Sequence, residues 1–349
     1  MYTRDDVAKR AGVSPAVVSY VLNNSNYVSE KKRQSVLKAI KELNYYPNAT
    51  ARSLKIGKSK EFLLVSDDIR NEMFSEITYY MEPVAYEKGY TLTVLSSAQK
   101  NYDDLLDSFS RKNYAGIFIF SGVIPFTKEY VDRLNSLAEQ GTPIVLFMFI
   151  HNETEFNSNI TVLRTNIKQA VCSAVDYLAD VKHHSIIGYL GDGDPIASGE
   201  SIPFGDGLRI NGYIDSLKKH GIEPKTEYVF FMDQFKNSKT FLNVEGMIEK
   251  FMQMPKPERP TAFFVNSDPL AAILMKRFKE LGFSVPDDIE IIGFGNTHSA
   301  NIVTPQITSV DMPCERIGLC AINILLAKAN HMDFENEFFE LKLVRRGSA

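Results

Sequence analysis

Apolar residues recur every three or four positions in the first part of the chain, which is the period of an amphipathic α-helix. Three segments show this period: residues 3–11, 15–22 and 30–43. Thr3 begins the first segment with a carboxylate three residues later, the pattern of a capping box, and Gly12 follows its end, where a positive φ is favoured. Ser14 and Pro15 begin the second segment as an N-cap and a first helical residue. The spacing therefore predicts two helices joined by a three-residue turn, a helix-turn-helix, and a third helix capped by Ser29.

The predicted second helix has an inner and an outer side. The apolar core of this head is expected to contain Val7, Ala8, Ala11, Val17, Val18, Val21, Leu22, Val36, Leu37, Ile40 and Leu43. This leaves Pro15, Ala16, Ser19 and Tyr20 on the outer side. In a helix-turn-helix the second helix lies in the major groove of DNA, with its N-terminal residues at the base edges. These four residues are the expected base-facing positions; a plain helical bundle with a basic surface is the alternative.

Residues 47–60 form a short, basic segment after the third predicted helix. Pro47 ends that helix and Asn48 can cap a further turn, but residues 49–54 supply little more than one helical turn, which is not stable alone. Leu54 lies among Arg and Lys residues, and such a side chain suits insertion into the minor groove, with Ala51 small enough for close approach. A disordered linker is the alternative.

From Phe62 onward, short apolar runs alternate with longer amphipathic stretches. The expected strands are residues 62–65, 91–95, 116–120, 144–149, 185–190, 228–232, 262–266 and 290–294. The expected helices are residues 74–88, 128–140, 167–179, 208–220, 241–252 and 270–281. Strands that alternate with helices predict right-handed βαβ units and doubly wound parallel sheets. Two such series predict an α/β body of two lobes, a fold that hosts many functions and assigns none.

Charge divides the chain in the same way as the apolar pattern. Of the 349 residues, 44% are hydrophobic and 23% are charged, as in an ordinary globular protein. The first 60 residues contain 12 Lys or Arg and 4 Asp or Glu, a net charge of +8, whereas the remaining 289 residues have a net charge of −12. A small basic head on an acidic body is typical of a nucleic-acid-binding module joined to a body that does not bind nucleic acid.

Several function classes lack their sequence signatures. Cys172, Cys314 and Cys320 are widely spaced, with no C-x-x-C pair and no nearby His, so free thiols are expected rather than disulfides or a metal site. The chain has no phosphate-binding, dinucleotide-binding or serine-nucleophile motif, so we expect neither an enzyme nor a cofactor. It shows no signal-peptide pattern and no apolar run of the ~18 residues that cross a membrane, which favours the cytoplasm.

The head closely resembles that of a known protein family. The similar residues are 6–14, 18–23, 28–29, 43–49 and 51–54. Over these residues the chain resembles the lactose-repressor/galactose-repressor family of bacterial transcription regulators. The resemblance implies contacts to backbone phosphates by Thr3, Ser14, Ser19, Asn23, Ser29, Tyr45 and Asn48. It also implies base contacts by Pro15, Ala16 and Tyr20, and insertion of Leu54 at the operator centre. The family usually has Arg at the position of Tyr20, so we expect a different half-site sequence.

Polar and aromatic residues follow the expected strands of the body near their carboxyl ends, where ligands bind in open α/β sheets. They are Asn71, Phe74, Ser121, Arg209 and Asp268. A carboxylate, a guanidinium and an aromatic ring in one cleft predict binding of a small molecule such as a sugar. In the alternative interpretation, Asp268 is the N-cap of the following helix and Arg209 forms a surface ion pair.

The body resembles the effector domain of the same family at residues 209–213, 267–271, 292–294 and 305–310. The resemblance implies two lobes like those of periplasmic binding proteins, with Arg209 and Asp268 in contact with a sugar or purine. Residues 1–46 would be the DNA-binding domain, 47–60 a hinge helix and linker, and 61–349 the effector-binding and dimerisation domain. The lobes would comprise about 61–161 with 295–327, and about 162–294 with 328–349.

Three departures from the family pattern remove charge from the expected cleft or hinge: Phe147-Met148-Phe149, Thr165-Asn166 and Gly295-Asn296. A less polar cleft favours an effector with fewer hydroxyl groups, or a changed switch. We therefore expect a cytoplasmic repressor that binds a palindromic double-stranded DNA operator as a homodimer and responds to a small-molecule effector, such as a carbohydrate. The alternatives are a regulator controlled by a protein partner, and a sugar-processing enzyme with an appended DNA-binding head.

Overall fold

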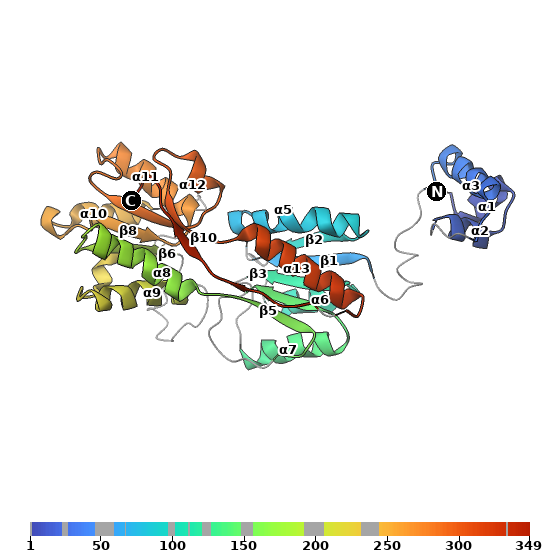
Figure 1. Ribbon diagram of the computed structural model, residues 1–349, viewed down its shortest axis with the longest axis horizontal. Helices are drawn as coiled ribbons and strands as arrows, with labels where there is room; N and C mark the ends of the chain where they lie inside the picture. Colours follow the sequence, from blue (N-terminus) through green and yellow to red (C-terminus); the bar gives the residue numbers. More distant parts are fainter. Residues whose placement is uncertain are drawn as a thin grey trace. The chain divides into compact units, whose positions relative to one another are not determined.

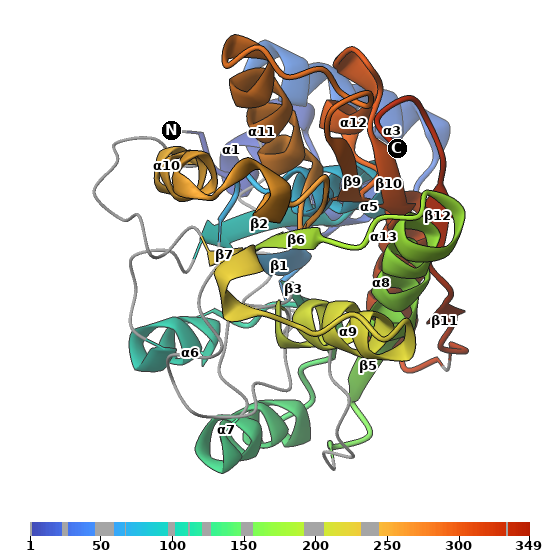
Figure 2. The ribbon, with the colours of Figure 1, turned by 90° about the vertical axis from the view of Figure 1, so that its left-hand side faces the viewer.

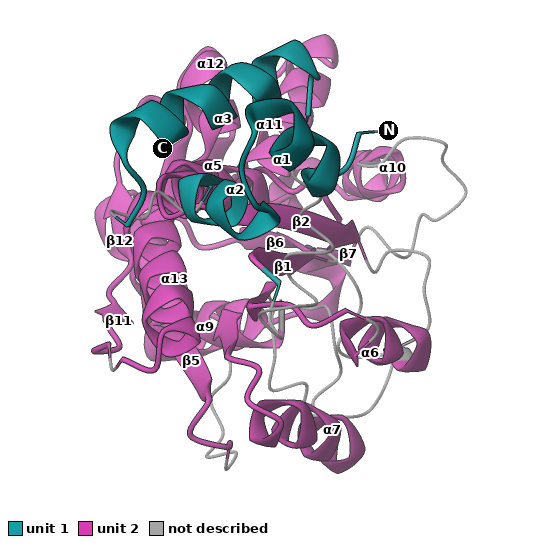
Figure 3. Ribbon diagram, turned by 90° about the vertical axis from the view of Figure 1, so that its right-hand side faces the viewer, with its two compact units in different colours: residues 1–59 teal, residues 60–349 magenta. Residues whose placement is uncertain are grey.

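The computed structural model divides the chain into two compact units, residues 1–59 and 60–349, which are coloured separately in Figure 3. It describes residues 2–22, 27–45, 59–66, 68–96, 102–110, 112–120, 127–147, 156–191, 206–231, 244–332 and 334–349. Each unit is described by itself below.

The smaller unit contains three helices around an apolar centre. They are α1 (Arg4–Ala11), α2 (Pro15–Leu22) and α3 (Glu30–Glu42). The predicted capping box at Thr3 is confirmed, and Gly12 ends α1 in the left-handed conformation, with a φ of 67°. Val18 and Val36 are fully buried in the centre, as predicted, but Leu37 is 46% exposed. The inner face of α3 continues from Val36 to the next turn, so the adjacent Leu37 points about 100° away from it.

The first lobe of the larger unit is a parallel sheet between two layers of helices (Figure 1). Its strands, in spatial order, are β2 (Thr91–Ser96), β1 (Glu61–Ser66), β3 (Gly116–Phe120), β4 (Ile144–Phe147), β5 (Ile160–Thr165) and β11 (Phe338–Phe339). Phe62 and Leu64 of β1 face helices α5 (Glu72–Glu87) and α13 (Cys314–Ala329). Leu63 and Val65 face α6 (Tyr102–Ser110) and α7 (Lys128–Glu139). A strand buried on both faces has the continuous apolar run seen in the sequence.

The second lobe repeats this arrangement. Its strands, in spatial order, are β7 (Val229–Phe231), β6 (Ile187–Gly191), β8 (Ala262–Val265), β9 (Glu290–Gly295), β10 (Thr308–Asp311) and β12 (Lys342–Val344). Only β12 among the described strands is antiparallel to its neighbour. One face is covered by α8 (Ile167–Asp176) and α9 (Asp206–Lys219). The other is covered by α10 (Glu245–Gln253), α11 (Asp268–Glu280) and the short α12 (His298–Ile302), as Figure 2 shows.

The chain passes between the lobes after β5, after β10, and between β11 and β12. These crossings correct the predicted lobe boundaries. Residues 308–311 pair in parallel with residues 292–295, so β10 extends the second sheet rather than belonging to the first lobe. Residues 338–339 pair with β5, so β11 belongs to the first lobe rather than the second. Both strands are short, and their sheet is decided by backbone pairing with distant residues, which a local apolar pattern does not reveal.

None of the helices in the described part of the chain is long and apolar enough to cross a bilayer. The three cysteines are free thiols, with Cys314 and Cys320 buried and Cys172 half-buried. Burial raises the pKa of all three thiols, which makes them poor nucleophiles.

Candidate functional site

The outer side of α2 is the surface on which the sequence predicts DNA bases. Pro15, Ala16 and Tyr20 are exposed, and Tyr20 is 48% exposed. Val18 and Val21 of the same helix are buried against the other helices. The structure therefore places the predicted base-facing side chains together on the side of α2 that packing leaves open.

Ser19, on the same side of α2, is hydrogen-bonded within the head. Its hydroxyl donates to the backbone carbonyl of Pro15 over 3.1 Å and accepts from Nη1 of Arg4 over 3.0 Å. Arg4 was not among the DNA-contacting residues predicted from the sequence. In the sequence, only its position next to Thr3, a predicted phosphate contact, pointed to a role in DNA binding. Its proximity to Ser19 depends on how α1 packs against α2, which the sequence pattern does not show.

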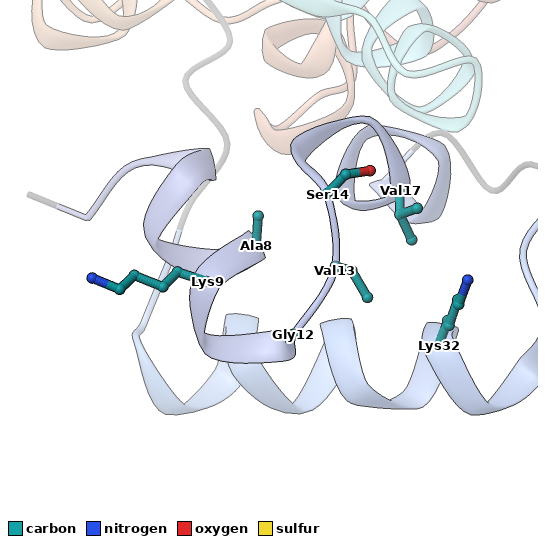
Figure 4. Close-up of a pocket in the computed structure, with 7 residues that line it drawn as sticks. All are labelled: Ala8, Lys9, Gly12, Val13, Ser14, Val17 and Lys32. Carbon is teal, nitrogen blue, oxygen red and sulfur yellow. The ribbon is translucent and has the colours of Figure 1, made fainter.

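Three of the predicted phosphate contacts, Thr3, Ser14 and Ser29, directly precede the three helices of the head. The Thr3 hydroxyl accepts from the Asp6 backbone N–H over 3.3 Å, so it caps α1. Ser14 lies in the exposed turn and, with Lys9 and Lys32, lines the hollow shown in Figure 4, in which the Lys9 side chain extends away from the turn. Ser29 occupies the N-cap position of α3 without a side-chain cap bond.

Tyr45 packs partly buried against the core of the head. The other predicted DNA contacts, Asn23, Asn48, Ala51 and Leu54, lie outside the described residues.

In the larger unit, both sheets reverse their strand order between two central strands, β1 and β3 in the first lobe and β6 and β8 in the second. Ligands of open α/β sheets bind outside the carboxyl ends of the strands at such a switch point. Asn71 follows β1 and caps α5, accepting from the Phe74 backbone N–H over 3.3 Å. Phe74 is 2% exposed and meets Phe120 edge to face, with 5.8 Å between ring centroids. Ser121 lies outside the described residues.

Arg209 is buried, so it does not lie at the surface as the alternative interpretation expected. It is 7% exposed, and its guanidinium lies 4.4 Å from the centroid of the Phe294 ring, a cation–π contact. Phe294 lies near the carboxyl end of β9. The aromatic face thus holds the guanidinium near the end of the second sheet where its ligand site is expected.

Asp268 is fully buried and is bound by other elements of the second lobe. Its carboxylate accepts from the Thr297 backbone N–H over 2.7 Å and from the Ser309 hydroxyl over 2.6 Å, and the Thr297 hydroxyl oxygen lies 3.2 Å from it. The N-cap alternative is wrong, because α11 begins at Asp268 itself, after Ser267. The carboxylate instead joins α11 to β10 and to the start of α12.

Glu72 connects the two lobes at the same place. It is the first residue of α5, in the first lobe, and its carboxylate accepts from the hydroxyl groups of Thr297 and Ser299, each over 2.6 Å. It also accepts from the Ser299 backbone N–H over 3.2 Å. The first N–H groups of a helix have no partner within it, so Glu72 caps α12 of the second lobe from the first lobe.

Asn266 is a further candidate for the ligand site that was not predicted from the sequence. It follows β8 at the switch point of the second sheet, and its backbone N–H donates to the Leu190 carbonyl of β6 over 2.9 Å. The side chain is 1% exposed, and neither its oxygen nor its nitrogen has a hydrogen-bond partner among the described residues. A buried amide of this kind is stabilised by a polar ligand. In the sequence, this role was indicated only by a polar residue, Asn266, at the end of an otherwise apolar predicted strand.

Two of the three departures from the family pattern have structural roles at the crossings, and Met148 and Phe149 of the third lie outside the described residues. The Asn166 side chain accepts from the Leu341 backbone N–H over 2.7 Å, which joins two crossing segments. Asn296 has a φ of 51° and donates from its side chain to Asp311 over 2.8 Å. Its side-chain oxygen accepts from Arg346 over 2.5 Å. Among the described residues, no group of His, Cys, Asp or Glu is arranged to hold a metal ion.

The chain is similar to known proteins along its whole length. Residues 3–48 match the model of bacterial regulatory proteins of the lacI family, and residues 175–349 match the model of a periplasmic binding protein-like domain. The HTH-type transcriptional repressor PurR of Proteus mirabilis is 32% identical over 355 residues, covering 100% of this chain and 97% of that protein.

Two solved structures share the fold. The lac repressor dimer bound to operator and the anti-inducer ONPF is 20% identical, with a TM-score of 0.77 over 99% of this chain and 98% of that chain. The transcriptional regulator CelR in complex with cellobiose is 21% identical, with a TM-score of 0.65 over 100% of both chains. The helix-turn-helix head and the two-lobed α/β body predicted from the sequence are therefore confirmed.

Proposed function

Because the chain belongs to the lacI family of bacterial regulatory proteins, we propose that it represses transcription in the cytoplasm by binding a palindromic DNA operator as a homodimer. A small molecule held between the lobes of residues 60–349 controls this binding. The protein is a regulator and not an enzyme. The observation that carries the proposal is a helix-turn-helix with an outward recognition surface, on a segment whose net charge is +8.

Two copies are needed because one head covers only half of a palindrome. Tyr79 and Tyr86 are 71% and 75% exposed on α5, seven residues apart and therefore on one side of the helix. Exposed Tyr residues are frequent anchors of protein interfaces. We assign this side of α5 to contact with a second copy of the chain; the dimeric state of the related lac repressor supports the second copy itself.

The effector is a carbohydrate or a related metabolite with a ring. The related CelR structure contains cellobiose, which supports a sugar in this fold. In this chain, the Asn266 amide offers a donor and an acceptor, whereas the region around β4 and β9 carries apolar or uncharged residues at Phe147 and Gly295. A site with few charges favours a ligand that is held by its ring face and a small number of hydroxyl groups.

Selection of duplexes from a random library by the full-length protein tests the DNA-binding part of the proposal. We expect a consensus with two-fold symmetry, because the two heads of a dimer are related by a two-fold axis. If the protein bound random competitor duplexes as strongly as any selected sequence at moderate salt, the DNA-binding part of the proposal would be contradicted.

A thermal-shift screen with sugars, nucleosides and phosphosugars tests the effector. We expect one of these classes to raise the unfolding midpoint and to change operator affinity. Turnover of a phosphosugar would support an enzyme instead. A complete lack of response to all three classes would support a regulator controlled by a protein partner.

A further inference from the structure

The helix expected in the major groove contains no charged residue. Its sequence, PAVVSYVL, has Pro15, Ala16, Ser19 and Tyr20 on the outer side. Pro15 and Ala16 offer only apolar contact, and the single proton of the Ser19 hydroxyl is donated to the Pro15 carbonyl. The major-groove edge of guanine presents two adjacent acceptors, N7 and O6, which are bound best by two parallel donors. No outer side chain of α2 supplies such a pair.

Arg4 brings a guanidinium to this side of α2 from the start of α1. Its Nη1 donates to the Ser19 hydroxyl over 3.0 Å. A guanidinium has five N–H donors in one rigid plane, so the bond to Ser19 leaves parallel donors for a base. Within residues 2–22 and 27–45, Ser19 is the one hydrogen-bond partner of Arg4.

The neighbouring capping box fixes the backbone from which Arg4 projects. The Asp6 carboxylate accepts from the Thr3 backbone N–H and hydroxyl, each over 2.7 Å. These bonds lower the pKa of Asp6 and keep its charge directed at Thr3. The Asp6 carboxylate is therefore bonded to Thr3 and does not hold the Arg4 guanidinium.

We infer that Arg4 contacts a guanine in the major groove of each operator half-site, and that Ser19 is the residue that positions it. This inference rests on the proposed DNA-binding function. It assigns sequence recognition to a residue outside the recognition helix and gives each half-site one obligatory G·C pair next to the bases that face Pro15 and Tyr20.

The test uses full-length wild type and four variants, Arg4→Lys, Arg4→Ala, Ser19→Ala and Lys9→Ala. Each selects duplexes from a random library, and affinities are then measured for the wild-type consensus and for every single-pair change in one half-site. Circular dichroism melting confirms that the head of each variant is folded. Lys9 is the matched control, because it is an exposed cation on the same helix.

In wild type, replacing the G·C pair should weaken binding about tenfold or more, the usual range for a bidentate contact. In Arg4→Ala this penalty should fall to about twofold, and in Arg4→Lys it should fall to an intermediate value, because an ammonium reaches the guanine acceptors without the planar fork. Ser19→Ala should give an intermediate penalty at the same pair. Lys9→Ala should weaken all sequences alike, as expected when a cation contributes through phosphate attraction.

The inference would be overturned if Arg4→Lys kept the full wild-type loss of affinity on replacement of the G·C pair and Arg4→Ala bound all duplexes more weakly by the same factor. Arg4 would then be a phosphate contact. The inference would also be overturned if Lys9→Ala lost the preference for the G·C pair as much as Arg4→Ala does. The preference would then not depend on the Arg4 guanidinium. If wild type itself selected no sequence, the proposed function would fail, and this inference with it.

Discussion

At the scale of single residues, Asp268 shows how burial and hydrogen bonding act on one carboxyl in opposite directions. Burial raises its pKa, whereas the bonds from Ser309 and Thr297 lower it, and the result is a pKa of about 6. The nearby carboxylate of Glu72 also raises it. The free energy of unfolding of the second lobe is therefore expected to depend on pH through Asp268. From the sequence, this residue was predicted only as an effector contact or a helix N-cap.

Asp268→Asn should reduce the dependence of stability on pH. The folded pKa of about 6 lies above the ordinary value of 3.8, so protonation stabilises the folded state below about pH 4, and this stabilisation is lost as the pH rises through 6. Wild type should gain about 1 kcal/mol in free energy of unfolding between pH 7 and pH 5 relative to the variant. Urea titrations at both pH values measure this difference.

The exposed Glu129→Gln on α7 serves as the control and should retain the wild-type difference. An Asp268→Asn protein with an unchanged pH dependence would show that other groups carry it.

At the scale of elements, each lobe brings two helices close together through a glycine. A Cβ at Gly318 of α13 would lie 2.6 Å from the Ile77 carbonyl of α5. A Cβ at Gly212 of α9 would lie 2.4 Å from the Lys168 carbonyl of α8. Real carbon atoms do not approach an oxygen so closely, so only glycine allows these helix pairs to pack as they do. Contacts between lobes depend on the resulting position of α5.

Glu72→Ala should loosen the connection between α5 and α12. It removes the acceptor of three hydrogen bonds from Thr297 and Ser299, and bonds to a charged acceptor contribute about 1.5–3 kcal/mol each. We expect hydrogen exchange of the Ser299 amide to become about tenfold faster or more. Exchange measured by mass spectrometry on peptides covering residues 297–302 provides the test.

Glu82→Ala removes an exposed carboxylate from the same helix and should leave this exchange rate unchanged. Equal protection of residues 297–302 in wild type and Glu72→Ala would mean that the lobes are held together by other contacts.

At the scale of the whole molecule, charge and symmetry act together. The first 60 residues have a net charge of +8 and the others −12, so DNA attracts one part of the chain and repels the rest. Binding through a basic head should weaken as salt rises, because phosphate contacts release counterions. The proposed dimer would double the number of these contacts, so its interface would control operator affinity.

Tyr86→Glu, alone or with Tyr79→Glu, should convert the proposed dimer into a monomer. Each change places a charge on a side chain that is more than two-thirds exposed on α5, where a second copy would bury it without a partner. We expect loss of the dimer in analytical ultracentrifugation and a loss of operator affinity of at least about tenfold, since only one head then binds.

Met252→Glu is the control, because it adds the same charge to an exposed apolar residue of α10. A variant with both substitutions on α5 that remained dimeric would place the interface elsewhere.

The sequence alone determined the features that depend on neighbouring residues. The capping box at Thr3 and the positive φ of Gly12 arise from local hydrogen bonds and local steric freedom, and the central strands arise from apolar runs that are buried on both faces. The exposed positions of α2 followed from a period of 3.6 residues. These features determined the head, the two-lobed α/β body and the outward-facing residues of α2, whose contact with bases stays a prediction.

Tertiary structure decided the features that depend on distant residues. Glu72 meets Thr297 across 225 positions of sequence, Arg4 meets Ser19 across 15, and β11 joins β5 rather than the second sheet. Asp268 has its partners on β10 and at the start of α12, so its role was not visible in its own helix. Such contacts form only when separate helices and strands pack together. They are stabilised by interactions between two distant segments, and neither segment shows a periodic pattern that reveals its partner.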